Sequence, residues 1–97
     1  MINKEQSRKI RSEIRRVLLD VWDPIGIRDE PNAQDEYDSY LGQVFELLIV
    51  RSSDRQLAEY LFEIVHDHMG LDRAKIGDME TTVRALRKID LVTSRSE

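Results

Sequence analysis

The chain contains no cysteine, two prolines and one tryptophan among its 97 residues, and its longest unbroken apolar run, residues 47–50, is short. Without cysteine it has no disulfide, no thiolate zinc site and no cysteine nucleophile, which suits a reducing cytoplasm. A bilayer span would need roughly 20 apolar residues. The first residues also lack the apolar core of a signal peptide and the start of a myristoylation motif. We therefore expect a cytoplasmic protein that does not enter a membrane.

The length suits one domain with a single hydrophobic core. Apolar residues recur at helical spacing, as at Ile10, Ile14 and Val21, and no stretch alternates in the manner of a strand. The sequence therefore predicts an all-α, single-domain bundle of about four helices. Within the domain 1–97, the helices are expected at approximately residues 4–21, 35–51, 54–69 and 79–91. A polar tail at residues 93–97 is expected to be frayed.

The connection between the first two helices is unusually long. Pro24 lacks an N–H and disfavours helix at the residue before it, so the first helix is expected to end near Trp22. Residues 23–34 follow neither helical nor strand periodicity, and Pro31 lies among residues typical of turns. Structureless loops of this length are uncommon in compact domains and are usually functional or mobile.

The other helix boundaries also carry signals. Asp35 is expected to cap the second helix, and Ser53 with Gln56 has the spacing of a capping box for the third. Gly70 is expected to end the third helix in a left-handed conformation. Asp78 is expected to cap the fourth helix. The second and third helices, joined by a tight turn, are expected to form an antiparallel hairpin.

Charge is distributed unevenly along the chain. The net charge is −4, with +3 in residues 1–22, −6 in residues 23–46 and −1 in the remainder. An acidic middle of this kind favours basic partners at the surface that it forms.

The segment between the first two helices is the best candidate for a binding surface. It combines aromatic side chains with carboxylates, as a surface that recognises a basic protein would. The predicted partner-binding residues are Trp22, Asp23, Asp29, Glu30, Asp35, Tyr37, Asp38 and Tyr40. Some have structural explanations, because Trp22 can fill the core and Asp35 and Asp38 carry charge that suits a helix N-terminus. Asp29 and Glu30 have no such role.

A protein-binding or regulatory module is therefore the leading hypothesis, and immunity to a basic toxin is its most concrete form. The alternative is a small enzyme or metal protein centred on the third helix, where Glu59, Glu63 and His66 share a face. A di-iron bundle needs the Glu-x-x-His motif on two helices, and this chain has one copy. The three side chains also lie away from the apolar stripe. We therefore expect no metal, no cofactor and no enzyme activity.

Two other kinds of partner have some support in the sequence. A basic row on the first helix, formed by Lys4, Arg8, Arg11 and Arg15, has the pattern of a phosphate-binding face. The negative net charge and the interleaved Glu5 and Glu13 argue against nucleic acid. The broad apolar stripe of the second helix leaves homodimerisation as a further alternative.

The sequence Trp22-Asp23-Pro24-Ile25-Gly26-Ile27, followed by Glu36-Tyr37-Asp38-Ser39-Tyr40, resembles small bacterial helical proteins classed as domains of unknown function. The resemblance covers roughly residues 10–70. It implies a helical fold and a bacterial source, and it transfers no catalytic residue. Inhibitory immunity proteins are similar in size and acidity rather than in motif.

Overall fold

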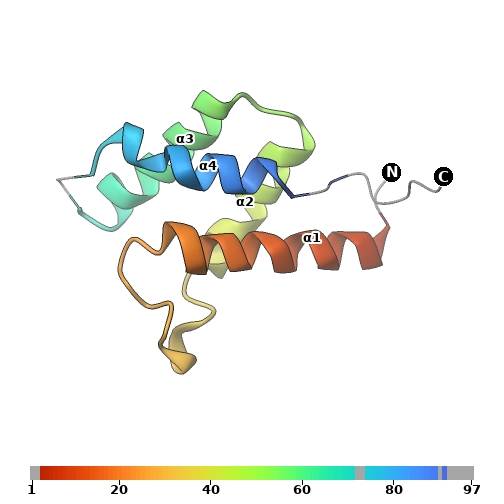
Figure 1. Ribbon diagram of the computed structural model, residues 1–97, viewed down its shortest axis with the longest axis horizontal. Helices are drawn as coiled ribbons and strands as arrows, with labels where there is room; N and C mark the ends of the chain where they lie inside the picture. Colours follow the sequence, from red (N-terminus) through yellow and green to blue (C-terminus); the bar gives the residue numbers. More distant parts are fainter. Residues whose placement is uncertain (1–2, 72–73, 90, 92–97) are drawn as a thin grey trace.

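The structure is a computed structural model that describes residues 3–71, 74–89 and 91. Its regular elements are all helical within these ranges, which confirms the predicted all-α bundle (Figure 1). In chain order they are α1 (Lys4–Val17), η1 (Leu18–Trp22), η2 (Pro31–Ala33), α2 (Asp38–Ile49), α3 (Asp54–Glu63), η3 (Ile64–His68), η4 (Ile76–Met79) and α4 (Glu80–Arg87). The predicted tail at 93–97 lies outside the described residues.

The first helix begins with a capping box. Asn3 Oδ1 accepts a hydrogen bond from the Gln6 amide at 2.8 Å, and the Asn3 amide donates to Gln6 Oε1 at 3.0 Å, so two otherwise unpaired N–H groups are satisfied. The helix continues through η1, a π-helical turn that ends at Trp22. The end predicted from Pro24 is therefore confirmed.

The predicted start of α2 at Asp35 is wrong by three residues. Helix α2 begins at Asp38 without a side-chain cap, and Asp35 contributes only its backbone carbonyl, which accepts from the Asp38 amide at 3.1 Å. The reason is that the chain first passes through tight turns, including the 3₁₀ helix η2. Each turn uses local backbone hydrogen bonds, so an α-helical start is delayed.

Both boundary signals of the third helix are confirmed. Ser53 Oγ accepts from the Gln56 amide at 3.1 Å while the Ser53 amide donates to Gln56 Oε1 at 2.9 Å. Helix α3 continues into the π-helical turn η3, and Gly70 follows with a φ of 69°. This left-handed conformation is one that glycine adopts without steric cost.

The fourth helix starts later than predicted, and Asp78 is not its cap. The Asp78 carboxylate accepts from the Lys75 amide at 3.0 Å, so it closes the 3₁₀ turn η4 instead. Helix α4 then begins at Glu80 without a side-chain cap. The sequence expectation placed the cap at the start of an α-helix, but a 3₁₀ turn lies before it.

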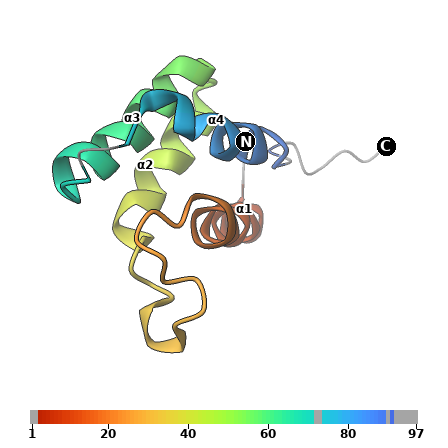
Figure 2. The same ribbon diagram turned by 60° about the vertical axis from the view of Figure 1, so that its left-hand side comes forward.

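The described residues pack around one hydrophobic core. Its buried members come from all four α-helices and from the turns beside them: Ile10, Ile14, Leu18, Leu19, Trp22, Tyr37, Leu41, Val44, Leu48, Leu57, Leu61, Ile64, Val65, Met79, Val83, Leu86 and Ile89. The predicted α2–α3 hairpin is wrong as a packing unit. Helix α2 packs mainly on α1, whereas α3 packs on α4 and η4, and the two helices diverge from their turn (Figure 2).

Candidate functional site

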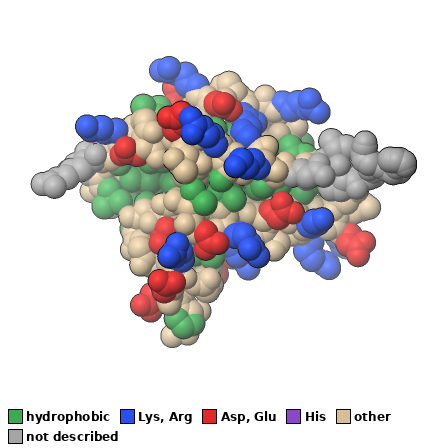
Figure 3. All heavy atoms as spheres, viewed as in Figure 1, with side chains coloured by type: hydrophobic (Ala, Val, Ile, Leu, Met, Phe, Trp, Pro, Cys, Tyr) green, Lys and Arg blue, Asp and Glu red, His purple; other side chains and the backbone are tan. Residues whose placement is uncertain are grey.

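The acidic loop, residues 23–37, is the main departure from the helical body. It leaves the end of η1, projects away from the bundle and returns to the start of α2 (Figures 1 and 2). Several acidic side chains lie on this projection, and a band of hydrophobic side chains is visible between α1 and α4 (Figure 3). The loop therefore offers a charged surface that the bundle does not cover.

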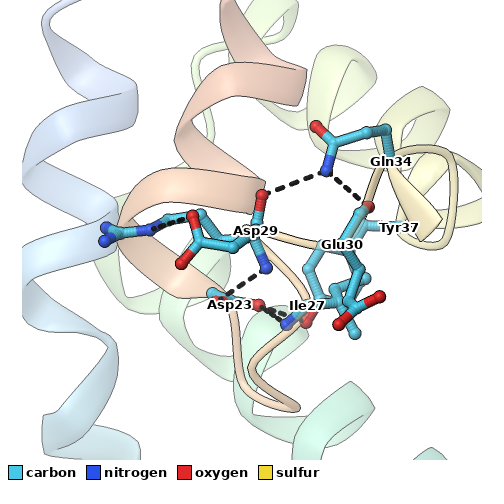
Figure 4. A network of polar contacts seen from close by, with 7 residues as sticks. Asp23, Ile27, Asp29, Glu30, Gln34 and Tyr37 are labelled. Atoms are coloured by element: carbon cyan, nitrogen blue, oxygen red, sulfur yellow. Dashed lines mark hydrogen bonds and ion pairs between the residues drawn. The ribbon is translucent and has the colours of Figure 1, made fainter. Parts of the chain in front are cut away.

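The carboxylate of Asp23 organises the first half of the acidic loop. Asp23 Oδ1 accepts from the Ile27 amide at 2.7 Å and from the Tyr37 hydroxyl at 2.9 Å (Figure 4). Its Oδ2 accepts from the Arg28 amide at 3.3 Å. The Tyr37 hydroxyl in turn accepts from the Ile25 amide at 3.2 Å. Asp23 was predicted to contact a partner, but its oxygens are occupied within the loop.

Gln34 holds the second half of the acidic loop in place. Its Nε2 donates to the carbonyl of Arg28 at 3.0 Å and to that of Glu30 at 2.9 Å (Figure 4). The Glu30 amide also donates to the Ile27 carbonyl at 3.0 Å. Together with the Asp23 contacts, these bonds satisfy backbone groups that would otherwise have to be bonded by water.

The aromatic residues form the base of the loop rather than a contact surface. Trp22 is 8% exposed and Tyr37 is 1% exposed. Their ring centroids are 5.2 Å apart, and Tyr40 meets Trp22 edge-on at 6.1 Å. Trp22 and Tyr37 therefore supply little area to a partner in this conformation, and Tyr40 is half-buried. The predicted contact surface therefore loses most of the aromatic area that was expected of it.

Burial also changes the acidity of Tyr37. Removal from water raises the pKa of Tyr37 above its ordinary value of 10.0, and the hydrogen bond to Asp23 raises the pKa further. The Ile25 amide acts in the opposite direction because it favours the phenolate. The neutral hydroxyl is therefore the form that the loop requires.

Asp38 is engaged by α1. Arg15 Nε donates to Asp38 Oδ1 at 3.0 Å and Arg15 Nη2 donates to Asp38 Oδ2 at 2.5 Å. This two-point contact joins the start of α2 to the last turn of α1. Asp38 was predicted to contact a partner, but its carboxylate already has an internal one.

The carboxylates that remain available are those of Asp29, Glu30 and Asp35, which are all exposed. The Asp29 side chain is 91% exposed and lies 3.8 Å from the Arg28 guanidinium, a distance typical of a weak surface ion pair. Glu36, which was not among the predicted contact residues, is exposed beside them. The set of eight predicted contact residues thus reduces to three, and Glu36 is added.

The alternative site on α3 is not assembled. Glu59 Oε2 pairs with Arg55 Nε at 3.0 Å, and His66 Nδ1 lies 2.8 Å from Asp67 Oδ1 with its ring stacked on Phe62. In the part of the chain that the structure describes, no three histidine or carboxylate side chains lie together in a metal-binding arrangement. These contacts are ordinary interactions of an exposed helix face.

Fold and site together define an all-α bundle with an internally bonded acidic loop. Comparison with protein-family models, curated proteins and solved structures found no match to this chain. The resemblance to bacterial domains of unknown function therefore stays a prediction. Among residues 3–71, 74–89 and 91, no helix has both the length and the apolar character needed to cross a membrane.

Proposed function

We propose that this protein is a small protein-binding module whose acidic loop recognises a basic surface on another protein. The observation that carries the proposal is that some polar side chains of the loop bond within it while others remain exposed. Asp23, Gln34 and Tyr37 hold the backbone, while Asp29 and Glu30 are left exposed at its surface. A loop held in place before binding loses less conformational entropy when the partner arrives.

Apolar groups beside the loop complete a surface of the composition common in interfaces. Val21 and Ile25 are 40% and 44% exposed. A hollow of about 590 Å³ includes Val21 in its lining, together with Trp22, Pro24, Val65, Leu71, Ala74, Asp78, Met79, Thr81 and Thr82. An apolar centre with a charged rim is the usual anatomy of a protein interface. The expected partner therefore presents an apolar side chain flanked by lysine or arginine.

The most specific form of the proposal is a cytoplasmic immunity-type inhibitor of a basic toxin. The exposed carboxylates support it because a toxin that acts on nucleic acid needs a basic surface, and an acidic loop competes for that surface. No contact in the described residues favours the enzyme alternative. The binding module is therefore the function that we put forward.

The test compares protein capture by two charge-reversed variants. The first is D29K/E30K, which reverses two exposed loop carboxylates. The second is E46K/E63K, a matched control with the same change in net charge at exposed positions of α2 and α3. Each is immobilised beside the wild-type protein, exposed to lysate of the source cells at physiological salt, and the captured proteins are quantified by mass spectrometry.

The proposal predicts a set of basic proteins that the wild-type protein and E46K/E63K retain and that D29K/E30K loses by about tenfold or more, since two reversed contacts cost at least about 1.4 kcal/mol. The melting temperatures should agree, because exposed side chains contribute little to stability. Equal capture by D29K/E30K and the wild-type protein would contradict the proposal.

A further inference from the structure

A second charged surface lies on α1. A groove of about 610 Å³ runs beside the start of α2. Its lining residues are Lys4, Ser7, Arg8, Arg11, Ser12, Arg15, Asp38 and Leu41. We call it the basic groove. The four cationic side chains lie along 12 residues of helix, and the first and last are about 16 Å apart along the axis at 1.5 Å per residue.

Three of these cations are available to an anion. Arg15 is neutralised by Asp38, the acidic residue that lines the groove. Within the described residues, no carboxylate forms an ion pair with Lys4, Arg8 or Arg11. The Arg11 guanidinium lies 4.8 Å from the centre of the Phe45 ring, a cation–π contact that holds it at the wall of the groove.

On the α2 side, the groove ends at the buried Leu41, and the next residue of the helix is an exposed glycine. Leu41 is 6% exposed and lines the groove. Gly42 follows on the exposed side, and a Cβ added there meets nothing within 4 Å. Glycine within a helix costs about 1 kcal/mol relative to alanine, so neither helix stability nor internal packing accounts for it. Its lack of a side chain allows another backbone to approach α2 closely.

We propose that the basic groove binds an acidic helix of a protein partner. Carboxylates spaced one turn apart on that helix pair with Lys4, Arg8 and Arg11, and its backbone approaches α2 beside Gly42. The length matches about three helical turns, and helix-in-groove binding is a common mode of peptide recognition. This site is independent of the acidic loop because it requires the opposite charge in its partner.

Charge and surface chemistry favour a peptide over nucleic acid. The net charge of −4 and the exposed loop carboxylates repel a long polyanion that runs past the groove. Phe45, which could otherwise stack on a base, is covered by Arg11. A short acidic helix avoids both obstacles, because its negative charge ends where the groove ends.

The test uses a fluorescent synthetic peptide of about four helical turns, with glutamates spaced one turn apart on one face. Its affinity is measured by fluorescence anisotropy with the wild-type protein and three variants. K4E/R8E reverses two groove cations and leaves the Arg11–Phe45 contact intact. K75E/K88E is the matched control, with the same net charge change at exposed positions outside the groove. G42L places a large side chain on the exposed face of α2 next to Leu41 without changing any charge.

We expect K4E/R8E and G42L each to weaken peptide binding by about tenfold, and K75E/K88E to stay within about twofold of the wild-type protein. Circular dichroism of all variants checks that the fold is retained. The proposal is overturned if the wild-type protein does not bind the peptide, or if K75E/K88E loses as much affinity as K4E/R8E. It is also overturned if a DNA duplex binds more tightly than the peptide. If light scattering shows that the wild-type protein self-associates and that K4E/R8E does not, the groove binds a second copy of the chain and the proposal is overturned.

Discussion

At the scale of single residues, Asp23 has the most consequential conformation. Its φ of 30° and ψ of 58° place it in the left-handed region, which disfavours most side chains. Aspartate is tolerated there because its short carboxylate bonds to nearby backbone groups. In this chain those groups are the amides of Ile27 and Arg28. One residue thus ends the π-helical turn and shapes the loop that follows.

Replacing Asp23 by glycine should destabilise the protein by about 1–3 kcal/mol, because three donors lose their acceptor. Glycine is chosen because it adopts the left-handed conformation without strain, so the loss does not come from a backbone clash of the new residue. Urea unfolding measures the change. Asp29→Gly is the control and should cost less, since the Asp29 side chain is 91% exposed. Equal losses in the two variants would show that Asp23 does not organise the loop.

Tyr37 makes the stability of the protein sensitive to alkaline pH. Its pKa is raised in the folded protein, so above pH 10 the unfolded chain loses the phenolic proton first. Stability from this group is therefore complete below its ordinary pKa and falls as the pH rises above it, by up to about 1.4 kcal/mol per pH unit. Burial raises the pKa of Tyr60 as well, so Tyr37 accounts for part of the loss.

The Tyr37→Phe variant separates this contribution. Near neutral pH it should be about 1 kcal/mol less stable than the wild-type protein, because the hydroxyl bonds to Asp23 and Ile25 are lost. Above pH 10 the difference should shrink, since phenylalanine has no proton to lose. Unfolding by urea across this range measures the difference. A difference in the free energy of unfolding that stays constant with pH would mean that folding does not raise the pKa of Tyr37.

At the scale of elements, two glycines provide a matched comparison. Gly70 ends the third helical run with a φ of 69°, whereas Gly42 lies within α2, and an added Cβ meets nothing within 4 Å at either position. Gly70→Ala should destabilise by about 1 kcal/mol through backbone strain. Gly42→Ala should stabilise by about 0.5–1 kcal/mol through helix propensity. Thermal unfolding of both variants shows whether each substitution raises or lowers the melting temperature. Melting temperatures that shift in the same direction would contradict the roles given to the two glycines.

The sequence predicts those elements whose signals are local. The Ser53–Gln56 capping box and the left-handed Gly70 depend on neighbouring residues, and both are present. The caps expected at Asp35 and Asp78 are absent because a tight turn precedes each helix. The π-helical turns η1 and η3 were not predicted. Such turns follow from side-chain packing, which has no periodic signature in the sequence.

The same distinction applies to the candidate site. Sequence reasoning identified the acidic loop and left Asp29 and Glu30 without a structural role, but it did not find the hydrogen bonds that occupy Asp23 and Asp38. Asp23 bonds to Tyr37, 14 positions away, and Asp38 bonds to Arg15, 23 positions away. Neither distant partner is marked by a local pattern. Only the folded chain shows that Asp29, Glu30 and Asp35 remain exposed.

At the scale of the whole molecule, charge is separated between two surfaces. The acidic loop carries exposed carboxylates, and the basic groove carries Lys4, Arg8 and Arg11 without internal ion pairs among the described residues. Exposed charges act over about one Debye length, about 8 Å at physiological salt. Each surface therefore acts mainly on a partner that comes close to it, and the two surfaces attract partners of opposite charge. The fold serves as a rigid support for both.

The most direct test of the account is an NMR titration of the ¹⁵N-labelled protein with a lysine-rich peptide at physiological salt. The central claim is that the acidic loop is the preferred site for a basic partner. It predicts that the largest shifts of amide signals fall in residues 28–36, where the exposed carboxylates lie, while the exposed face of α3 with Glu59 and Glu63 changes little. Shifts that are largest on α3, or spread evenly over every acidic stretch, would contradict the claim.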